Sequence, residues 1–173
     1  MNYYLLPDVP YSTYESYVAK NGPSAVLKAR SLSPLKIVDD IRESGLRGRG
    51  GAGFSTGVKW KTILDHPCPL RYVVCNAAEG EPGTFKDRLL LRRNPYAVLE
   101  GLLIAAHAVG AKTIYFGIKA SFESEIHRLN QAIHEMRTAE LVSDIDIVVL
   151  AGPGGYLFVE GKEPLGHGAG GVL

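Results

Sequence analysis

The sequence predicts an α/β fold in which a parallel sheet carries helices on both faces. Three short runs, residues 71–75, 113–118 and 145–150, are rich in β-branched and aromatic residues and have the composition of buried strands. Segments with helical periodicity separate these runs. Strands that alternate with helices are typical of a parallel sheet covered by its crossover helices.

A helical lead-in is expected before the sheet. Residues 13–20 and 24–30 have the composition of two short helices. Ser33 and Pro34 then match the N-cap and the first position of a longer helix, and Gly45 is a typical stop signal. We therefore predict a helix between Pro34 and Gly45 that leads into the rest of the fold.

Three further helices are predicted, one before the first strand and one in each connection between strands. Residues 56–64 follow a glycine-rich loop, residues 94–110 open on Asn-Pro and close on glycine, and residues 121–141 have one apolar face. Residues 76–88 are polar and contain two glycines and a proline, so we predict a loop there.

The composition excludes a general nucleic-acid-binding protein. The formal net charge is +1 over 173 residues, whereas such a protein needs a strong basic bias. Any anion site must therefore be local. Many of the 20 glycines gather in residues 45–57 and 152–171, which is typical of backbone that approaches a ligand closely.

Two cysteines, Cys68 and Cys75, are too few for an iron–sulfur cluster or a cysteine-rich zinc site. We expect no metal site in this chain, and the low cysteine count suits a reducing compartment. The longest apolar stretch, 97–110, contains Glu100 and His107 and is shorter than the ~20 residues of a membrane span. With no secretory signal visible, we expect a soluble, cytoplasmic protein, either free or peripheral to a membrane complex.

The glycine-rich segment 45–59 does not match a standard nucleotide motif in context. Residues 48–53 satisfy the letters G-x-G-x-x-G, but the Rossmann fingerprint follows a strand, and a helix is predicted before this loop. A Walker loop is also excluded, because Gly57 is followed by Val58 and no Gly-Lys-Ser/Thr occurs.

The same segment nevertheless has the chemistry of an anion cradle. Consecutive small residues expose backbone N–H groups, and Thr56 can cap the next helix, whose N-terminus adds positive potential. Arg47, Arg49 and Lys59 add full charges. The loop suits a phosphate group or the flat face of an aromatic ring. The alternative is a flexible loop with solvated arginines.

The predicted loop at 76–88 is acidic. Glu79, Glu81 and Asp87 alternate with basic residues just after a strand. Carboxylates are natural acceptors for ribose hydroxyls and for a carboxamide, and Asn76 can hydrogen-bond a flavin edge or a phosphate. The alternative is an ordinary surface loop with weak ion pairs.

All three predicted strands end in polar or glycine residues that could serve a site. These are Asn76, Lys119 and Gly152 with the residues that follow them. Ligands of open parallel sheets bind at the carboxyl ends of the strands. The topology therefore predicts a ligand site at this edge.

Two segments resemble a known family. Residues 44–60 (SGLRGRGGAGFSTGVKW) and 74–88 (VCNAAEGEPGTFKDR) are similar to the signature segments of the NADH-binding flavoprotein subunit of respiratory complex I. The same segments occur in the diaphorase subunits of NAD-reducing hydrogenases and NAD-dependent formate dehydrogenases. The similarity runs from about Tyr17 to Tyr156 and covers the N-terminal FMN-domain portion of that family.

The resemblance implies a helical lead-in at 1–33 and a Rossmann-like domain at 34–173 that is incomplete at its C-terminus. In such a domain, FMN is the bound cofactor and NADH stacks on its isoalloxazine ring. NADH gives a hydride to FMN, and electrons then pass singly to iron–sulfur clusters on other subunits of a complex. The family's cluster cysteines are missing here, so no cluster is expected in this chain.

The resemblance also implies roles for individual residues, none of them catalytic in its own right because the cofactor supplies the chemistry. Phe54 would stack on the adenine side of NADH, Lys59 would approach its phosphates, and Glu81 would bind the nicotinamide ribose or carboxamide region. Glu160 is retained from a later wall of the site. The residues that would surround FMN are Gly48, Arg49, Gly50, Gly51, Lys59, Asn76 and Glu79.

Several positions depart from the family pattern and leave two functions open. Ala78 replaces an aspartate, Ser55 replaces a proline, and Val159 and Gly161 replace a glycine and a glutamate. The first function is the FMN- and NADH-binding part of an NADH dehydrogenase or diaphorase. The second is a degenerate paralogue that serves as a non-catalytic module of such a complex. A plain phosphate-binding protein without flavin is a third reading, and the preference for NAD or NADP stays open.

Overall fold

The computed structural model describes residues 6–20, 22–49 and 52–152. The strands are β1 (Tyr72–Ala77), β2 (Thr113–Lys119) and β3 (Asp146–Gly152). The helices are α1 (Tyr14–Val18), α2 (Ser24–Arg30), α3 (Pro34–Glu43), α4 (Thr56–Asp65), α5 (Lys86–Arg93), α6 (Pro95–Val109) and α7 (Glu123–Thr138).

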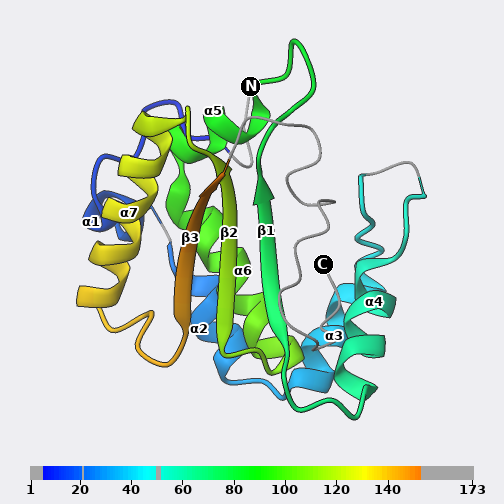
Figure 1. The fold of residues 1–173 in the computed structure, drawn as a ribbon. Helices are drawn as coiled ribbons and strands as arrows, with labels where there is room; N and C mark the ends of the chain where they lie inside the picture. Colours follow the sequence, from blue (N-terminus) through cyan, green and yellow to red (C-terminus); the bar gives the residue numbers. More distant parts are fainter. Residues whose placement is uncertain (1–5, 21, 50–51, 153–173) are drawn as a thin grey trace.

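The strands of the described residues form one parallel sheet in the order β1-β2-β3 (Figure 1). Val73 of β1 pairs with Ile114 of β2, and Ile114 pairs with Ile147 of β3. The predicted parallel α/β fold is therefore confirmed, and each predicted strand lies within one residue or two of its observed bounds. Since the strands are parallel, their carboxyl ends share one edge of the sheet.

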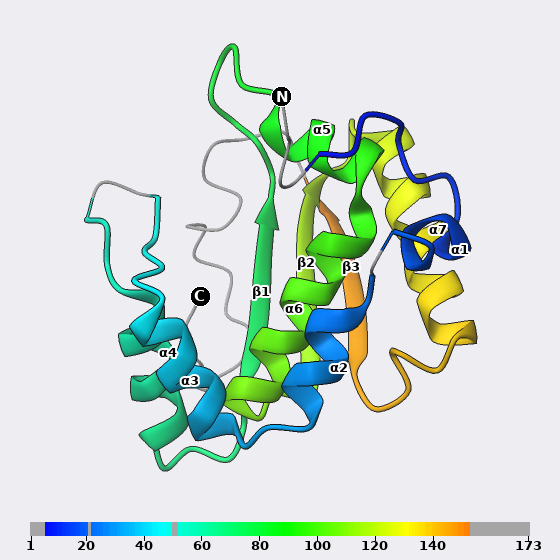
Figure 2. The same cartoon turned by 180° about the vertical axis from the view of Figure 1, so that it is seen from behind.

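The hydrophobic core lies between the sheet and the helices α6 and α7. Ile114, Phe116 and Ile118 alternate along β2 and are fully buried. Helix α6 contacts β1 and β2, α7 contacts β3, and the two helices contact each other, so they pack on the same face (Figure 2). Tyr115, on the opposite face of β2, is only half-buried.

The expected covering of both faces is the part of the fold prediction that the described residues do not reproduce. Both crossover connections, β1 to β2 and β2 to β3, step in the same direction along the sheet. Right-handed crossovers that step in one direction place their helices on one face. In the described part of the chain, the other face carries side chains such as Tyr72 and Tyr115, whose rings lie 5.6 Å apart.

Two local predictions were wrong. Residues 76–88 are not all loop: β1 extends through Asn76 to Ala77, and α5 begins at Lys86. The predicted helix 121–141 is shorter, because α7 runs from Glu123 to Thr138. By contrast, Ser33 caps α3 as predicted, its hydroxyl accepting from the Lys36 N–H at 3.3 Å.

The lead-in packs on the sheet-covering helices, with α2 against α6 and α1 against α7 (Figure 2). Glu100, buried within α6, accepts hydrogen bonds from the Tyr17 hydroxyl and from the Val26 N–H, the latter at 2.8 Å. Glu135 of α7 accepts from the Tyr14 N–H at 2.7 Å. Two carboxylates thus hold α1 and α2 in place.

Candidate functional site

The glycine loop and the acidic turn lie at the same end of the molecule as the carboxyl ends of the strands. Figure 1 shows the segment after β1 continuing beyond the tip of that strand, and the loop between α3 and α4 rising on the neighbouring side. This is the edge where ligands of open parallel sheets bind. The structure therefore brings together the two segments that the sequence singled out.

The glycine loop is a hairpin closed by backbone hydrogen bonds. The Thr56 N–H donates to the Leu46 carbonyl at 3.0 Å, and the Gly48 N–H donates to the Phe54 carbonyl at 2.9 Å. Arg47 and Ser55 form an antiparallel bridge between the two arms. The N–H of Gly48 is thus used within the hairpin, so it is not one of the backbone donors that this loop can offer to an anion.

The base of this hairpin is set by close packing of α3 and α4. A Cβ atom on Gly57 would lie 2.5 Å from the backbone nitrogen of Arg42 and 2.6 Å from its Cα. Only glycine allows this approach, because real Cβ atoms do not come so near to backbone. The close packing of α3 on α4 therefore fixes the positions of the two ends of the loop.

Cations line the hairpin and the start of α4. Arg49 and Lys59 are exposed, and neither has an ion pair within the described residues. Arg47 donates to the Gly53 carbonyl at 3.2 Å. The Lys59 ammonium lies 5.9 Å from the ring centre of Phe54, which is 50% exposed. An aromatic face beside unpaired cations suits a ring that carries phosphate.

The predicted cap of α4 is one residue off. The N-cap position is Ser55 instead of Thr56, and its side chain makes no capping hydrogen bond. The Thr56 N–H is bound by the Leu46 carbonyl, but no side chain caps the helix, so this helix end keeps a partial positive charge that favours an anion.

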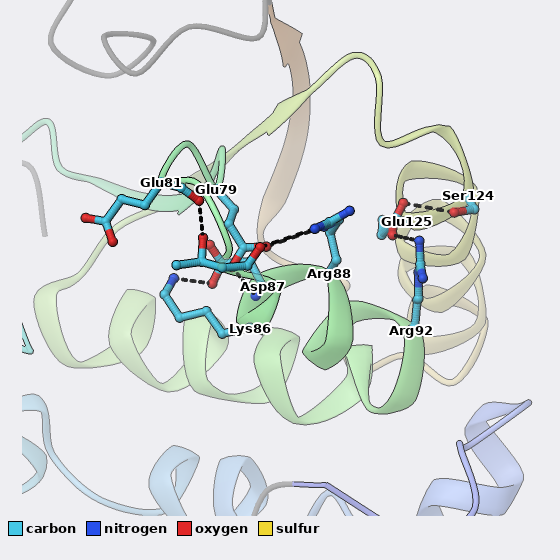
Figure 3. Close-up of polar contacts among 9 residues, drawn as sticks. Glu79, Glu81, Lys86, Asp87, Arg88, Arg92, Ser124 and Glu125 are labelled. Atoms are coloured by element: carbon cyan, nitrogen blue, oxygen red, sulfur yellow. Dashed lines mark hydrogen bonds and ion pairs between the residues drawn. The ribbon is translucent and has the colours of Figure 1, made fainter.

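The acidic turn begins at Asn76, an exposed residue of β1. Its side-chain carbonyl accepts from the Ala78 N–H at 3.1 Å, which bends the chain away from the sheet. The Glu81 carbonyl accepts from the Thr84 hydroxyl at 2.8 Å, and the Glu81 side chain is exposed. Figure 3 shows the Glu81 carboxylate pointing away from the other charged groups of the turn. It is the acceptor that this turn presents to solvent.

Glu79 lies inside the turn. It is 8% exposed, and its carboxylate accepts from the Asp87 N–H at 3.3 Å, at the start of α5. Its other oxygen lies 3.5 Å from Nε of Arg88 (Figure 3). Phe85, at the N-cap position of α5, makes no side-chain capping hydrogen bond. The Glu79 carboxylate, which comes earlier in the sequence, caps this helix instead.

The environment of Glu79 favours the ionised carboxylate. Burial raises the pKa of Glu79, but the backbone N–H groups of Asp87 and Lys86 and the charge of Lys86 outweigh it, so the pKa lies below its ordinary value of 4.5. Burial likewise raises the pKa of Glu125, but the hydrogen bond from the Ser124 hydroxyl and the charge of Arg92 outweigh it, so this pKa also lies below its ordinary value. Arg92 lies 2.5 Å from the Glu125 carboxylate (Figure 3).

These shifts predict a loss of stability in acid. A carboxyl group whose pKa is lowered by folding stabilises the folded state fully above its unfolded pKa, near 4.5, and loses that contribution as pH falls through the folded pKa. We expect the urea midpoint to hold from pH 7 to 5 and to fall below pH 4.5. Glu79→Gln should lower the urea midpoint at pH 7, and the midpoint should then fall less steeply below pH 4.5 than in the wild type. An equally steep fall in the variant would contradict the role of Glu79.

A second cation group lies at the same edge, and the sequence pointed only to its Lys119, as a residue at the end of a predicted strand. Arg88 and Lys119 both lie over the ring of Phe122, at 5.2 Å and 5.5 Å from its centre. Lys119 is the last residue of β2, and this position at a strand end is the sequence feature that points to a role in ligand binding. The pairing with Arg88 joins segments far apart in sequence and follows only from the fold.

Three of the predicted site residues, Gly50, Gly51 and Glu160, lie outside the described residues. The described residues include no group of three or more His, Cys, Asp or Glu that could hold a metal ion. None of the described helices combines the length and the apolar character needed to cross a bilayer. The arrangement that remains is a ligand edge with cations on one side and a carboxylate acceptor on the other.

Comparison with known proteins identifies related sequences. The family model described as the Nuo51 FMN-binding domain matches residues 41–164. A subunit of the NADH-quinone oxidoreductase of Aquifex aeolicus is 40% identical over 151 residues, which are 83% of this chain and 35% of that protein. A subunit of the corresponding enzyme of Rhizobium meliloti is 47% identical over 133 residues, 74% of this chain and 31% of that protein.

A solved structure is similar in sequence and in fold. The crystal structure of an NAD+-reducing NiFe hydrogenase in the air-oxidized state superposes with a TM-score of 0.71 at 33% identity. The match covers 86% of this chain and 26% of the hydrogenase chain. The chain thus spans about a third of the length of the curated relatives it matches, and less of the hydrogenase chain.

Proposed function

The chain belongs to the Nuo51 FMN-binding domain family, and from this we propose that it forms the FMN- and NADH-binding part of an NADH dehydrogenase or diaphorase. When bound, FMN supplies the hydride-accepting and single-electron chemistry that protein side chains lack. The relatives named above are subunits of oxidoreductases or hydrogenases. We accordingly propose that iron–sulfur subunits of a larger assembly take the electrons.

One observation carries this proposal: within the described residues, the ligand edge presents cations without ion pairs together with an exposed carboxylate. Arg49 and Lys59 stand on the hairpin side without ion pairs in the described part of the chain, while Glu81 stands exposed on the acidic turn. Phosphates need the first kind of group, and ribose hydroxyls need the second. The donor set therefore fits a flavin nucleotide together with a nicotinamide nucleotide.

We propose the following roles in ligand binding for the described residues. Lys59 and Arg49 hold phosphate, and the half-exposed ring of Phe54 stacks on the adenine of NADH. Asn76 and Gly48 approach the flavin from the strand end and from the hairpin. Glu79, whose carboxylate holds the start of α5, keeps the acidic turn in shape beside the flavin. The same proposal extends to Gly50, Gly51 and Glu160.

A second candidate function rests on Ala78. The family pattern has an aspartate at this position, and alanine removes one polar contact to the flavin. A chain that keeps the fold but binds flavin poorly would serve as a non-catalytic module of the complex. The domain limits that we propose, 1–33 for the lead-in and 34–173 for the binding domain, hold under either function.

The deciding experiment records the flavin spectrum of the purified chain with FMN before and after NADH, without oxygen. Bleaching of the flavin band by NADH is the expected result. Flavin binding without bleaching would favour the non-catalytic module, and the lack of any flavin binding would contradict the proposed function of this chain.

We predict that Glu81→Gln weakens NADH binding about tenfold and leaves FMN binding within about twofold, since one charge-assisted hydrogen bond to a ribose is lost. Calorimetric titration with each ligand measures both effects. Glu15→Gln is the matched control, because Glu15 is an exposed carboxylate on α1, away from the ligand edge. Equal losses for NADH and FMN would show that Glu81 has another role.

A further inference from the structure

The turn after β2 holds Lys119 in a defined place at the ligand edge. Lys119 is the last residue of the central strand and pairs in register with Gly152. The Ala120 N–H donates to the Gly152 carbonyl at 2.8 Å, and the Phe122 N–H donates to the Lys119 carbonyl at 3.0 Å. These bonds place Phe122 beside Lys119 at the start of α7.

Phe122 is shared by two cations. The Lys119 ammonium lies 5.5 Å from the ring centre and the Arg88 guanidinium 5.2 Å from it. Lys119 is half-buried, which is uncommon for lysine, and no carboxylate within the described residues pairs with it. By contrast, the side chain of Lys112, which directly precedes β2, is 78% exposed, and its ammonium lies 4.0 Å from the Asp144 carboxylate.

The charges around this ring do not balance. Among the described residues, Arg88 has one carboxylate neighbour, Glu79 at 3.5 Å, and that carboxylate already accepts from the Asp87 N–H. The Nε atom of Arg88 is buried and makes no hydrogen bond within the described residues. Two cations held close together against one engaged carboxylate leave an excess of positive charge at the ligand edge, which an anion would neutralise.

We propose that Lys119, held on Phe122 beside Arg88, binds a phosphate group of a nucleotide at the carboxyl edge of the sheet. The inference rests on the proposed function. A flavin mononucleotide and a dinucleotide bound together bring two separate phosphate groups to this edge, whereas the hairpin supplies one set of cations. A lysine ammonium is a compact point charge and is well suited to the second phosphate.

The test compares Lys119→Gln with Lys112→Gln, which removes the same charge just before the start of β2. FMN, riboflavin and NADH are titrated separately into each purified variant and into the wild type, by flavin fluorescence or by calorimetry. We expect the dissociation constant of FMN to rise about tenfold or more in Lys119→Gln, with riboflavin unchanged, because one charge-assisted contact is lost. Lys112→Gln should bind all three ligands like the wild type.

The titrations with different ligands also show whether the phosphate bound by Lys119 belongs to FMN or to NADH. Weaker FMN binding with unchanged riboflavin binding identifies the flavin monoester, and weaker NADH binding with unchanged FMN binding identifies the pyrophosphate. Unchanged affinities, or equal losses for FMN and riboflavin, would overturn the inference while the proposed function stands. If the wild type binds none of the three ligands, both the inference and the proposed function fail. Lys119→Arg should restore most of the affinity, which a purely structural role would not require.

Discussion

Gly57→Ala is expected to destabilise the protein and to abolish tight flavin binding. The added Cβ atom would meet the backbone of Arg42 at 2.5 Å, and backbone cannot rotate away as the end of a side chain can. Overpacking of this kind costs about 1–3 kcal/mol, which outweighs the gain of up to about 1 kcal/mol that alanine normally brings to a helix.

The loss of binding follows from where Gly57 lies. Helices α3 and α4 hold the two ends of the glycine hairpin, so moving them apart would move Arg49 and Lys59 relative to the acidic turn. We expect flavin affinity to fall by at least about a hundredfold, as misplaced binding groups commonly cause. Urea unfolding and flavin fluorescence titration measure the two effects.

Gly101→Ala is the matched control for this prediction. Gly101 also lies within a helix, α6, but a Cβ added there would meet nothing within 4 Å. The variant should be as stable as the wild type or more stable by up to about 1 kcal/mol, with unchanged flavin binding. If Gly57→Ala behaves like Gly101→Ala, the packing of α3 on α4 does not control the hairpin.

Much of the fold could be predicted because its signals are local. The cap at Ser33 and the glycine after α6 are read within a few residues, and the three strands are apolar runs. Helix α5 could not be predicted in this way. It follows a turn with two glycines and a proline, and its N-terminus is held by Glu79, which lies eight residues before Asp87. A cap that far upstream has no sequence signature.

The same distinction applies to the site. The composition of the hairpin and of the acidic turn pointed to the ligand edge, because charge and glycine content are visible in sequence. The use of the Gly48 N–H inside the hairpin and the sharing of Phe122 by Arg88 and Lys119 depend on contacts across the fold. Such contacts arise from topology, and periodicity does not encode them.

Glu100→Ala is expected to be the most destabilising single change in the lead-in contact. Glu100 is 7% exposed and lies in the apolar helix α6, where a carboxylate is stable only if its oxygens are bound. One oxygen accepts from the Val26 N–H at 2.8 Å and the other accepts from the Tyr17 hydroxyl. Burial, followed by that hydrogen bond and the Glu100 charge, raises the pKa of Tyr17, so the hydroxyl stays a donor at neutral pH.

Removal of the Glu100 side chain leaves two buried donors without an acceptor and opens a small cavity. Each unsatisfied donor costs about 1–3 kcal/mol, so we expect a loss of about 3 kcal/mol and a fall in Tm of roughly 10 °C. Differential scanning calorimetry measures the fall. Glu100→Gln is the control, because its carbonyl can still accept from Val26 and its amide can donate to Tyr17, and it should cost about 1 kcal/mol. Equal losses in the two variants would mean that the negative charge, and not the hydrogen bonds, holds the lead-in on α6.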